Sequence, residues 1–310
     1  MPGVKLPTST LPPTTLDWYG CATFRLRTAG LTLFLDAYID RAPGAAGTGS
    51  SANDIDECDW ILIGHSHFDH VYGAERIVAN TAATVIGSYE TVRLLEQAGV
   101  PITRMICVGG GERIELGRGV TVAVFPSLHS CVWSHTQMPP PDEVCLGDLG
   151  TTWQERSQRM SNVVTYLRTA LDATAVEHRQ AAAPGHSSRG DGGALVYLIE
   201  APDGSVLFQD TSGHWSGILD GLRPDVAILA AAGRANIDGE PAQGTLADFV
   251  ADQAALLGSP RVILAHHDDW LPGFSIDTDV SPIRAALAER APTAELLEPG
   301  YLAATPIFAP

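Results

Sequence analysis

The amino-acid sequence predicts an α/β protein in which two similar layers, each made of a sheet and its helices, face each other. Two observations support this fold class. A run of short strands gives way to alternating strands and helices in the first half of the chain, and the same succession returns in the second half. The chain has 310 residues, of which 45% are hydrophobic, so it can bury a sizeable core.

The first half opens with three short strands, expected at residues 16–20, 22–27 and 31–39. An apolar run in the third strand ends at Asp36. Its carboxylate either caps a turn or is delivered to a site at the tip of the strand. The segment 42–53, rich in Gly, Ala and Ser, is expected to be a loop.

Strands and helices alternate after this loop. The single histidine that follows the last strand of this half, His129, is functional only if other groups join it, because a lone histidine at such a place is more often structural. The expected strands are 60–64, 83–87 and 120–125, and the expected helices are 73–80 and 90–98.

Four side chains that can bind metal follow the strand at 60–64, in His65-Ser66-His67-Phe68-Asp69-His70. In an extended chain, His65 and His67 project to the same side, so one ion could bind both. As the chain bends into a helix, Asp69 and His70 turn towards a second position, roughly 3.5–4 Å from the first in two-metal hydrolases. Imidazole and carboxylate suit zinc, iron or manganese, and this segment has no soft ligand. A solvated histidine-rich loop is the weaker interpretation.

Residues 131–191 break the alternation and are expected to form an insertion over the mouth of the site. Residues 153–178 read as one long helix or two shorter ones. One or two of its arginines could hold an anionic substrate group, although an ordinary solvated helix face is the favoured explanation of them. These arginines are Arg156, Arg159, Arg168, Arg179 and Arg189.

The second half begins with a hairpin, 194–200 and 205–209, that ends at Asp210. A later strand, 261–266, delivers His266 and His267. The remaining strands are expected at 225–230 and 294–297, and helices at 246–257 and 282–289.

The composition limits the partners and the compartment. The formal net charge of −17 disfavours nucleic acid and anionic membranes, because both need a basic face. Residues 1–15 read as a tail rather than a signal peptide, and no apolar stretch is long enough to span a bilayer. Five widely spaced cysteines do not suggest disulfides, which favours the cytoplasm. We expect residues 16–310 to form one domain, and a homo-oligomer is compatible with the sequence.

The motifs resemble the metallo-β-lactamase superfamily. Residues 65–70 match its H-x-H-x-D-H signature, and the resemblance extends from about residue 16 to residue 298. It implies the four-layer αββα sandwich of that superfamily, with residues 131–191 as a partly helical lid. The isolated groups that follow the family order are Asp36, His129, Asp210 and His266.

The resemblance also implies a role for each ligand. His65, His67 and His129 would hold one divalent ion, and Asp69, His70 and His266 a second, with Asp210 bridging them. Asp36 would steady the metal-binding loop from outside the ligand set. His266 and His267 compete for the last position, and His266-His267-Asp268 favours His266, which leaves His267 as a supporting residue of the pocket.

The opening Trp18-Tyr19-Gly20-Cys21-Ala22-Thr23-Phe24 looks like the branch that contains the ascorbate-phosphate lactonases and the N-acyl-phosphatidylethanolamine phospholipase D enzymes. Those relatives usually carry histidine in place of Cys21. The departure leaves the implied ligands unchanged and weakens the transfer of a particular substrate.

The implied activity is hydrolysis of a small-molecule ester, lactone or phosphodiester by a hydroxide that bridges two ions, zinc first, with manganese or iron as alternatives. Asp69 would orient the hydroxide and collect its proton. His214 or His135 could protonate the leaving group, although a packing or surface role suits each of them too. His135, Arg189 and Trp270 are the predicted pocket residues.

Two other functions compete with this hypothesis. β-Lactam hydrolysis is disfavoured by the bridging aspartate, which the antibiotic-degrading members generally lack. A non-hydrolytic member, either a metal-binding scaffold or an iron redox protein, is the alternative from another class. The complete ligand set argues against a scaffold, and the chain has no room for a flavin domain beside the core.

Overall fold

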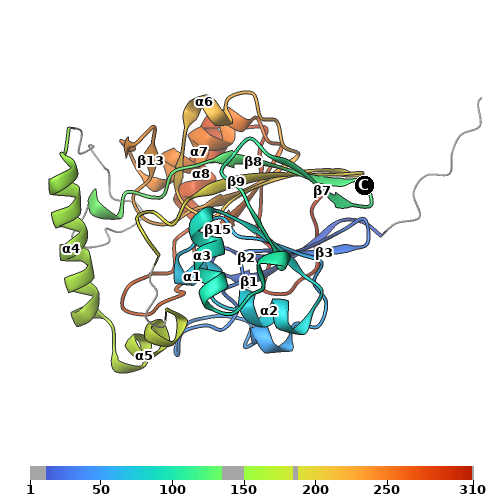
Figure 1. Ribbon diagram of the computed structural model, residues 1–310. Helices are drawn as coiled ribbons and strands as arrows, with labels where there is room; N and C mark the ends of the chain where they lie inside the picture. The colour runs from blue at the N-terminus through green and yellow to red at the C-terminus, as the bar shows by residue number, and fades with distance from the viewer. Residues whose placement is uncertain (1–11, 135–149, 184–187, 309–310) are drawn as a thin grey trace, which may run out of the picture.

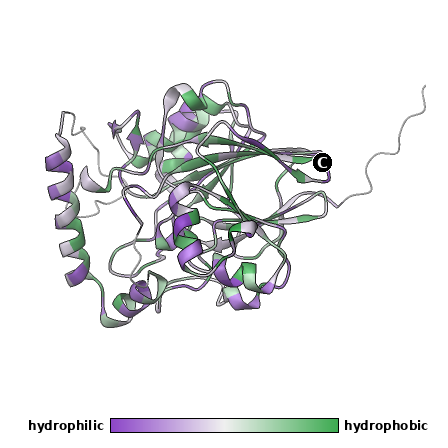
Figure 2. Ribbon diagram, viewed as in Figure 1, coloured by the Kyte–Doolittle hydropathy of each residue, from purple (hydrophilic) through white to green (hydrophobic). Residues whose placement is uncertain are grey.

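The computed structural model describes residues 12–134, 150–183 and 188–308 (Figure 1). Two seven-stranded sheets face each other, and helices cover the outer face of each. The predicted four-layer αββα sandwich is confirmed. Figure 2 shows hydrophobic residues along the strands of both sheets, whereas the helices mix hydrophobic and hydrophilic residues.

The first sheet joins an antiparallel meander to a parallel part. Its strands, in spatial order, are β17 (Thr305–Pro306), β1 (Thr15–Gly20), β2 (Thr23–Thr28), β3 (Leu31–Leu35), β4 (Trp60–Leu62), β5 (Thr84–Gly87) and β6 (Met105–Cys107).

The second sheet repeats this plan, and β9 and β10 form the predicted hairpin. Its strands, in spatial order, are β16 (Glu295–Leu297), β15 (Arg261–Ala265), β12 (Val226–Ala230), β10 (Gly204–Gln209), β9 (Leu195–Ala201), β8 (Val120–Pro126) and β7 (Arg113–Gly117). A small third sheet contains β11 (Gly213–His214), β13 (Asn236–Ile237) and β14 (Glu240–Pro241).

The core between the sheets follows from alternation along the strands. In β8, the side chains of Val120, Val122 and Val124 point inward and are fully buried, and those of β2 do the same at Phe24 and Leu26. Inward apolar side chains from both sheets therefore form one shared core.

Helices close the outer faces. On the first sheet lie α1 (Phe68–Val71), α2 (Ala74–Asn80) and α3 (Tyr89–Gln97), and on the second lie α6 (Ser216–Leu219), α7 (Leu246–Leu257) and α8 (Ser281–Arg290). The predicted bounds of α7 are met because both its ends carry strong signals. Thr245 and Asp248 form a capping box at its start, and Gly258 ends it in a left-handed conformation.

The third predicted strand is shorter than expected. It ends at Leu35 rather than at residue 39, because Asp36 adopts a left-handed conformation with φ 55°. The strand therefore does not continue beyond Asp36, whose carboxylate accepts a hydrogen bond from the Gly64 backbone N–H. Of the predicted tail, residues 1–11 lie outside the described part, and Thr15 already begins β1.

The predicted insertion contains two helices, α4 (Trp153–Ala170) and α5 (Ala173–Ala182). α4 stands along one edge of the sandwich (Figure 1). Residues 135–149 and 184–187 of this segment lie outside the described part. Among the described residues, no helix is both long enough and apolar enough to cross a membrane, and Cys21, Cys58, Cys107 and Cys131 are free thiols.

Candidate metal centre

The polar residues singled out in the sequence converge where strands of both sheets end. β3 leads to Asp36, β8 to His129, and β15 to His266. The segments after β4 and β10 bring the 65–70 motif and Asp210 to the same place. The strands are buried, so the side chains that follow them are held on a rigid frame.

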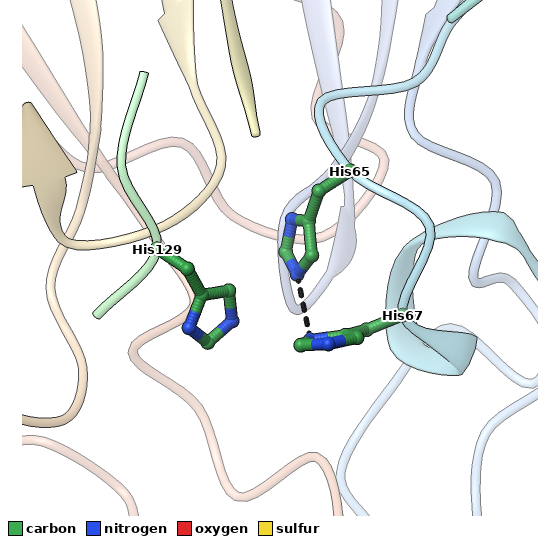
Figure 3. Close-up of side chains that lie close together, drawn as sticks. All are labelled: His65, His67 and His129. Atoms are coloured by element: carbon green, nitrogen blue, oxygen red, sulfur yellow. Dashed lines mark hydrogen bonds between the residues drawn. The ribbon is translucent and has the colours of Figure 1, made fainter. Parts of the chain in front are cut away.

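Three histidines form the first group of ligands (Figure 3). The donor atoms of His65, His67 and His129 all lie within 4.8 Å of one another. His65 Nε2 is 3.1 Å from His67 Nδ1, and the ring of His129 lies 4.8 Å and 4.7 Å from the rings of His65 and His67. Three imidazole nitrogens facing one point suit a single divalent cation.

A second group lies beside the first. Asp69 Oδ2 is 3.4 Å from His70 Nε2 and 3.2 Å from His266 Nε2. Asp210 Oδ2 connects the groups, because it is 2.6 Å from His65 Nδ1 and 3.2 Å from His70 Nδ1. The structure therefore brings all seven predicted ligands together.

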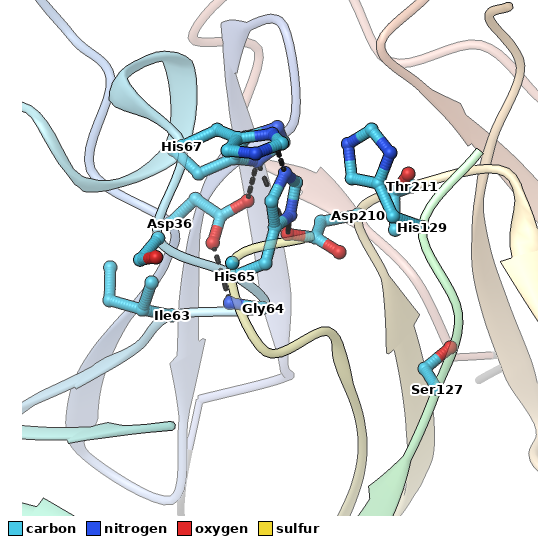
Figure 4. A network of polar contacts seen from close by, with 12 residues as sticks. Asp36, Ile63, Gly64, His65, His67, Ser127, His129, Asp210 and Thr211 are labelled. Carbon is cyan, nitrogen blue, oxygen red and sulfur yellow. Dashed lines mark hydrogen bonds and ion pairs between the residues drawn. The ribbon is translucent and has the colours of Figure 1, made fainter. Parts of the chain in front are cut away.

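Two further residues fix these groups in place (Figure 4). Asp36 Oδ2 lies 2.7 Å from His70 Nδ1, while its Oδ1 accepts from the Gly64 N–H at 2.9 Å. A Cβ on Gly64 would lie 2.2 Å from the carboxylate of Asp210, so only glycine leaves room for that side chain. Asp36 therefore contacts both His70 and the backbone that precedes His65.

The chemistry of this cluster fits metal ions. The carboxylates of Asp36, Asp69 and Asp210 are all buried, and Asp210 Oδ1 has no hydrogen-bond partner among the described residues. Burial and the neighbouring Asp210 raise the pKa of Asp36 to about 8, so Asp69 and Asp210 carry the buried negative charge at pH 7. Burial of this charge is costly unless a cation balances it. Burial and the neighbouring His70 lower the pKa of His65 to about 4. Its imidazole is therefore neutral at pH 7, the state that binds metal.

A cavity of about 320 Å³ opens onto the centre and is lined by His67, Asp69, His129 and His266. Its other walls are largely apolar. They include Met160, Val163, Val164 and Leu167 of α4, together with Trp270 and Phe274 from the segment after β15. The inserted helix thus covers the site, and Trp270 has its predicted place in the pocket.

Arginines also line the cavity. Arg179 of α5 and Arg234 are among the lining residues, whereas Arg189 is not. The side chain of Arg189 is exposed, and its backbone N–H donates to Glu90. Among the insertion arginines, Arg179 is therefore the one that the described structure places at the pocket.

Two predicted histidines lie away from the cluster. His214 is buried in β11, with its ring stacked on Phe249 at 5.5 Å, and it does not line the cavity. His267 stacks on Trp18 at 4.6 Å, so His266, and not His267, faces Asp69. His135 lies outside the described residues.

Cys21 also lies beside this centre, although the sequence pattern did not predict it. Its Sγ and the donor atoms of Asp69 and His266 all lie within 4.8 Å of one another. The available signal was the position of Cys21 in the turn between the first two strands, at the same end of the sheet as Asp36. The ligand environment therefore includes the soft donor that the 65–70 segment lacks.

Comparisons with known proteins agree with the fold. Residues 32–147 match a family model described as a beta-lactamase superfamily domain. A UPF0173 metal-dependent hydrolase of Pyrobaculum arsenaticum is 34% identical over 115 residues, which cover 37% of this chain and 50% of that protein. The chain thus spans about half the length of the curated relatives that it matches.

Two solved structures share the architecture. Igni18, a metallo hydrolase from the archaeon Ignicoccus hospitalis, has a TM-score of 0.58 at 18% identity, covering 93% of this chain and 97% of its own. CmlA, a diiron β-hydroxylase from Streptomyces venezuelae, has a TM-score of 0.53 at 15% identity, covering 95% of this chain and 54% of its own. The chain therefore has the metallo-β-lactamase fold, and its residues 32–147 are similar to the beta-lactamase superfamily domain.

Proposed function

We propose that this chain is a metal-dependent hydrolase that holds two divalent ions and acts on a small-molecule ester, lactone or phosphodiester. The observation that carries the proposal is the pair of ligand groups beside a cavity, with Asp210 in contact with His65 and His70. The names of the matched relatives, metal-dependent hydrolases, support the same class.

The proposed division of the ligands between two ions follows the resemblance to the metallo-β-lactamase superfamily, and His70 lies close to both Asp69 and Asp210. His65, His67 and His129 would hold one ion, Asp69, His70 and His266 the other, and Asp210 would contact both. When bound, such a pair of ions lowers the pKa of a shared water and polarises the oxygen of the substrate that is attacked.

Asp69 is the ionised group placed to orient the nucleophile. Burial opposes its ionisation, but His70 and His266 hold the pKa of its carboxyl well below the usual value. The carboxylate lines the cavity and stays an acceptor at neutral pH, so it can take a hydrogen bond from water and fix the direction of attack. His214 has no part in this scheme because it does not line the cavity.

The cavity limits the substrate. A volume of about 320 Å³ is at the lower end of small-molecule sites, which run from roughly 300 to 1,000 Å³. The apolar wall from α4 suits a substrate with an apolar portion, and Arg179 offers a positive charge for an anionic group. We also propose that the chain is related to the branch of the ascorbate-phosphate lactonases and the N-acyl-phosphatidylethanolamine phospholipase D enzymes, which residues 18–24 resemble.

The test combines metal analysis with turnover. Purified protein is loaded with zinc, manganese or iron and assayed on lactones, phosphodiesters and β-lactams, with Asp69→Asn as the variant and exposed Asp220→Asn as the control. We expect two equivalents of metal in the unaltered protein and in Asp220→Asn, and turnover at least about a hundredfold lower in Asp69→Asn, the loss typical of removing a general base. Metal with no turnover of any substrate would contradict the proposal.

A second candidate function is oxidation, favoured by the likeness to a diiron β-hydroxylase. The same preparations separate the two candidates. Iron loading that gives oxygen consumption without hydrolysis would favour an oxidative role over a hydrolytic one.

A further inference from the structure

We propose that Cys21 is a further ligand of the second metal position, beside Asp69 and His266, and that it makes this position selective for zinc. The inference rests on the two-metal centre proposed above and concerns which residues complete it. No role in metal binding follows for Cys21 from the H-x-H-x-D-H signature, which lies more than forty residues further along the chain.

Cys21 lies beside two of the candidate ligands, Asp69 and His266. The Sγ of Cys21, a carboxylate oxygen of Asp69 and a ring nitrogen of His266 lie within 4.8 Å of one another, and Cys21 is completely buried. The thiol donates to the Asp69 backbone carbonyl, with Sγ 3.6 Å from the oxygen. Among the described cysteines, only Cys21 belongs to a group of this kind.

The centre also contains an independent sign of a missing ligand. Asp210 is completely buried, yet its Oδ1 has no hydrogen-bond partner among the described residues. Buried polar atoms of this type are normally satisfied, so this one indicates a cation in the centre that contains Asp69, His266 and Cys21.

The backbone holds Cys21 and His266 as one unit. Both residues adopt a left-handed backbone conformation, with φ 51° and 62°, which residues other than glycine seldom adopt. The His266 N–H donates to the Cys21 carbonyl at 2.8 Å, and the Cys21 N–H donates to Asp268 Oδ1 at 3.0 Å. Keeping a side chain at two such positions has an energetic cost, and a shared ligand role explains it.

The thiol of Cys21 also has the ligand chemistry that suits zinc. On binding Zn²⁺, the thiol would lose its proton to solvent as the Sγ–zinc bond forms. A thiolate favours zinc over manganese, because it is a soft ligand.

The competing explanation is that Cys21 is a small apolar residue of the core. Cys58 is such a residue: it is buried, donates to the Trp60 carbonyl and packs in the core beneath α2. Cys58→Ser is therefore the matched control for Cys21→Ser, because each change replaces one buried thiol by a hydroxyl.

The experiment uses cobalt(II) in place of zinc in the full chain. A cobalt–thiolate bond gives an intense charge-transfer absorption in the near ultraviolet, whereas nitrogen and oxygen ligands do not. We expect this band in the unaltered protein and in Cys58→Ser, and its loss in Cys21→Ser. Zinc affinity of the second position should fall at least about tenfold in Cys21→Ser, while manganese affinity changes little.

The outcomes separate this inference from the proposed function. Absence of the band in the unaltered protein, or its survival in a folded Cys21→Ser variant, would overturn the role of Cys21 alone. Failure of the unaltered protein to bind any cobalt or zinc would overturn the two-metal hydrolase as well. If Cys21→Ser does not fold, absence of the band in the unaltered protein still overturns the role of Cys21.

Discussion

At the scale of single residues, Gly64 shows how closely the metal centre is packed. Its N–H donates to Asp36, and the space where a side chain would begin is occupied by the carboxylate of Asp210. Its φ is not in the left-handed region, so the need for glycine at this position is one of space and not of backbone conformation.

Gly64→Ala tests this arrangement. We expect the added methyl group to displace Asp210, because the two would approach to 2.2 Å, and to weaken metal binding by roughly tenfold or more. Metal content after dialysis against a weak chelator measures the effect, with circular dichroism as the check on folding. Gly217→Ala is the control, because nothing lies within 4 Å of a Cβ at that position. Full metal retention in Gly64→Ala would show that Asp210 does not need its observed place.

Single residues differ in how far the sequence could predict them. The 65–70 motif and the three groups at strand ends could be assigned, because a strand fixes where its last side chain arrives. His214 could not, since the three residues between it and Asp210 are not helical and the chain turns into β11 instead. Cys21 was missed because its contacts with Asp69 and His266 join segments that are far apart in the sequence.

At the scale of elements, α4 combines an exposed polar face with an apolar stripe. Met160, Val163, Val164 and Leu167 follow the i, i+3, i+4, i+7 spacing of one helix face, and all four line the cavity. Val163 is the buried member, with 5% of its surface exposed. The helix therefore contributes a wall and no ligand.

Val163→Glu tests the role of this wall. We expect kcat/KM to fall roughly tenfold to a hundredfold for a substrate with an apolar group, mainly through KM, because burial of a valine is worth about 1.5–3 kcal/mol. The metal content should not change. Steady-state kinetics on a homologous series of esters, with Asn162→Glu on the exposed face as control, measures this. An equal loss for apolar and compact substrates would argue against substrate contact by α4.

Elements with strong local patterns were predicted closely, and α7 agrees to the residue. β6, β7, β13 and β14 were not predicted. They are two to five residues long, and pairing with neighbouring strands defines them more than their own sequence does. The same reason explains the short β17, which pairs with β1 from the other end of the chain.

At the scale of the whole molecule, the candidate centre joins the two halves. The 65–70 motif follows a strand of the first sheet, whereas His129, Asp210 and His266 follow strands of the second. Bound ions would therefore cross-link the layers. This arrangement could be anticipated from the repeated succession of strands and helices, but the cavity between the layers and α4 depends on distant contacts that no local pattern encodes.

Metal removal tests this cross-link. We expect the chelated protein to stay folded, because the core between the sheets is apolar, and to melt at a lower temperature than the loaded protein. The stabilisation should grow with free metal, reaching about 2.7 kcal/mol at a metal concentration one hundred times the dissociation constant. Thermal unfolding at several buffered zinc concentrations measures it, and His129→Ala should reduce the increment. An identical melting temperature with and without metal would contradict the cross-link.

The position of α4 places part of the cavity wall and the candidate ligands on different elements of the chain. The groups that would perform the reaction follow strands of the two sheets, whereas the apolar wall lies on a helix between β8 and β9. Variation in the helix can alter which molecules enter without moving a single ligand, so recognition and chemistry are free to diverge at different rates. Exchange of this segment would accordingly change the apolar wall of the cavity and leave the candidate ligands in place.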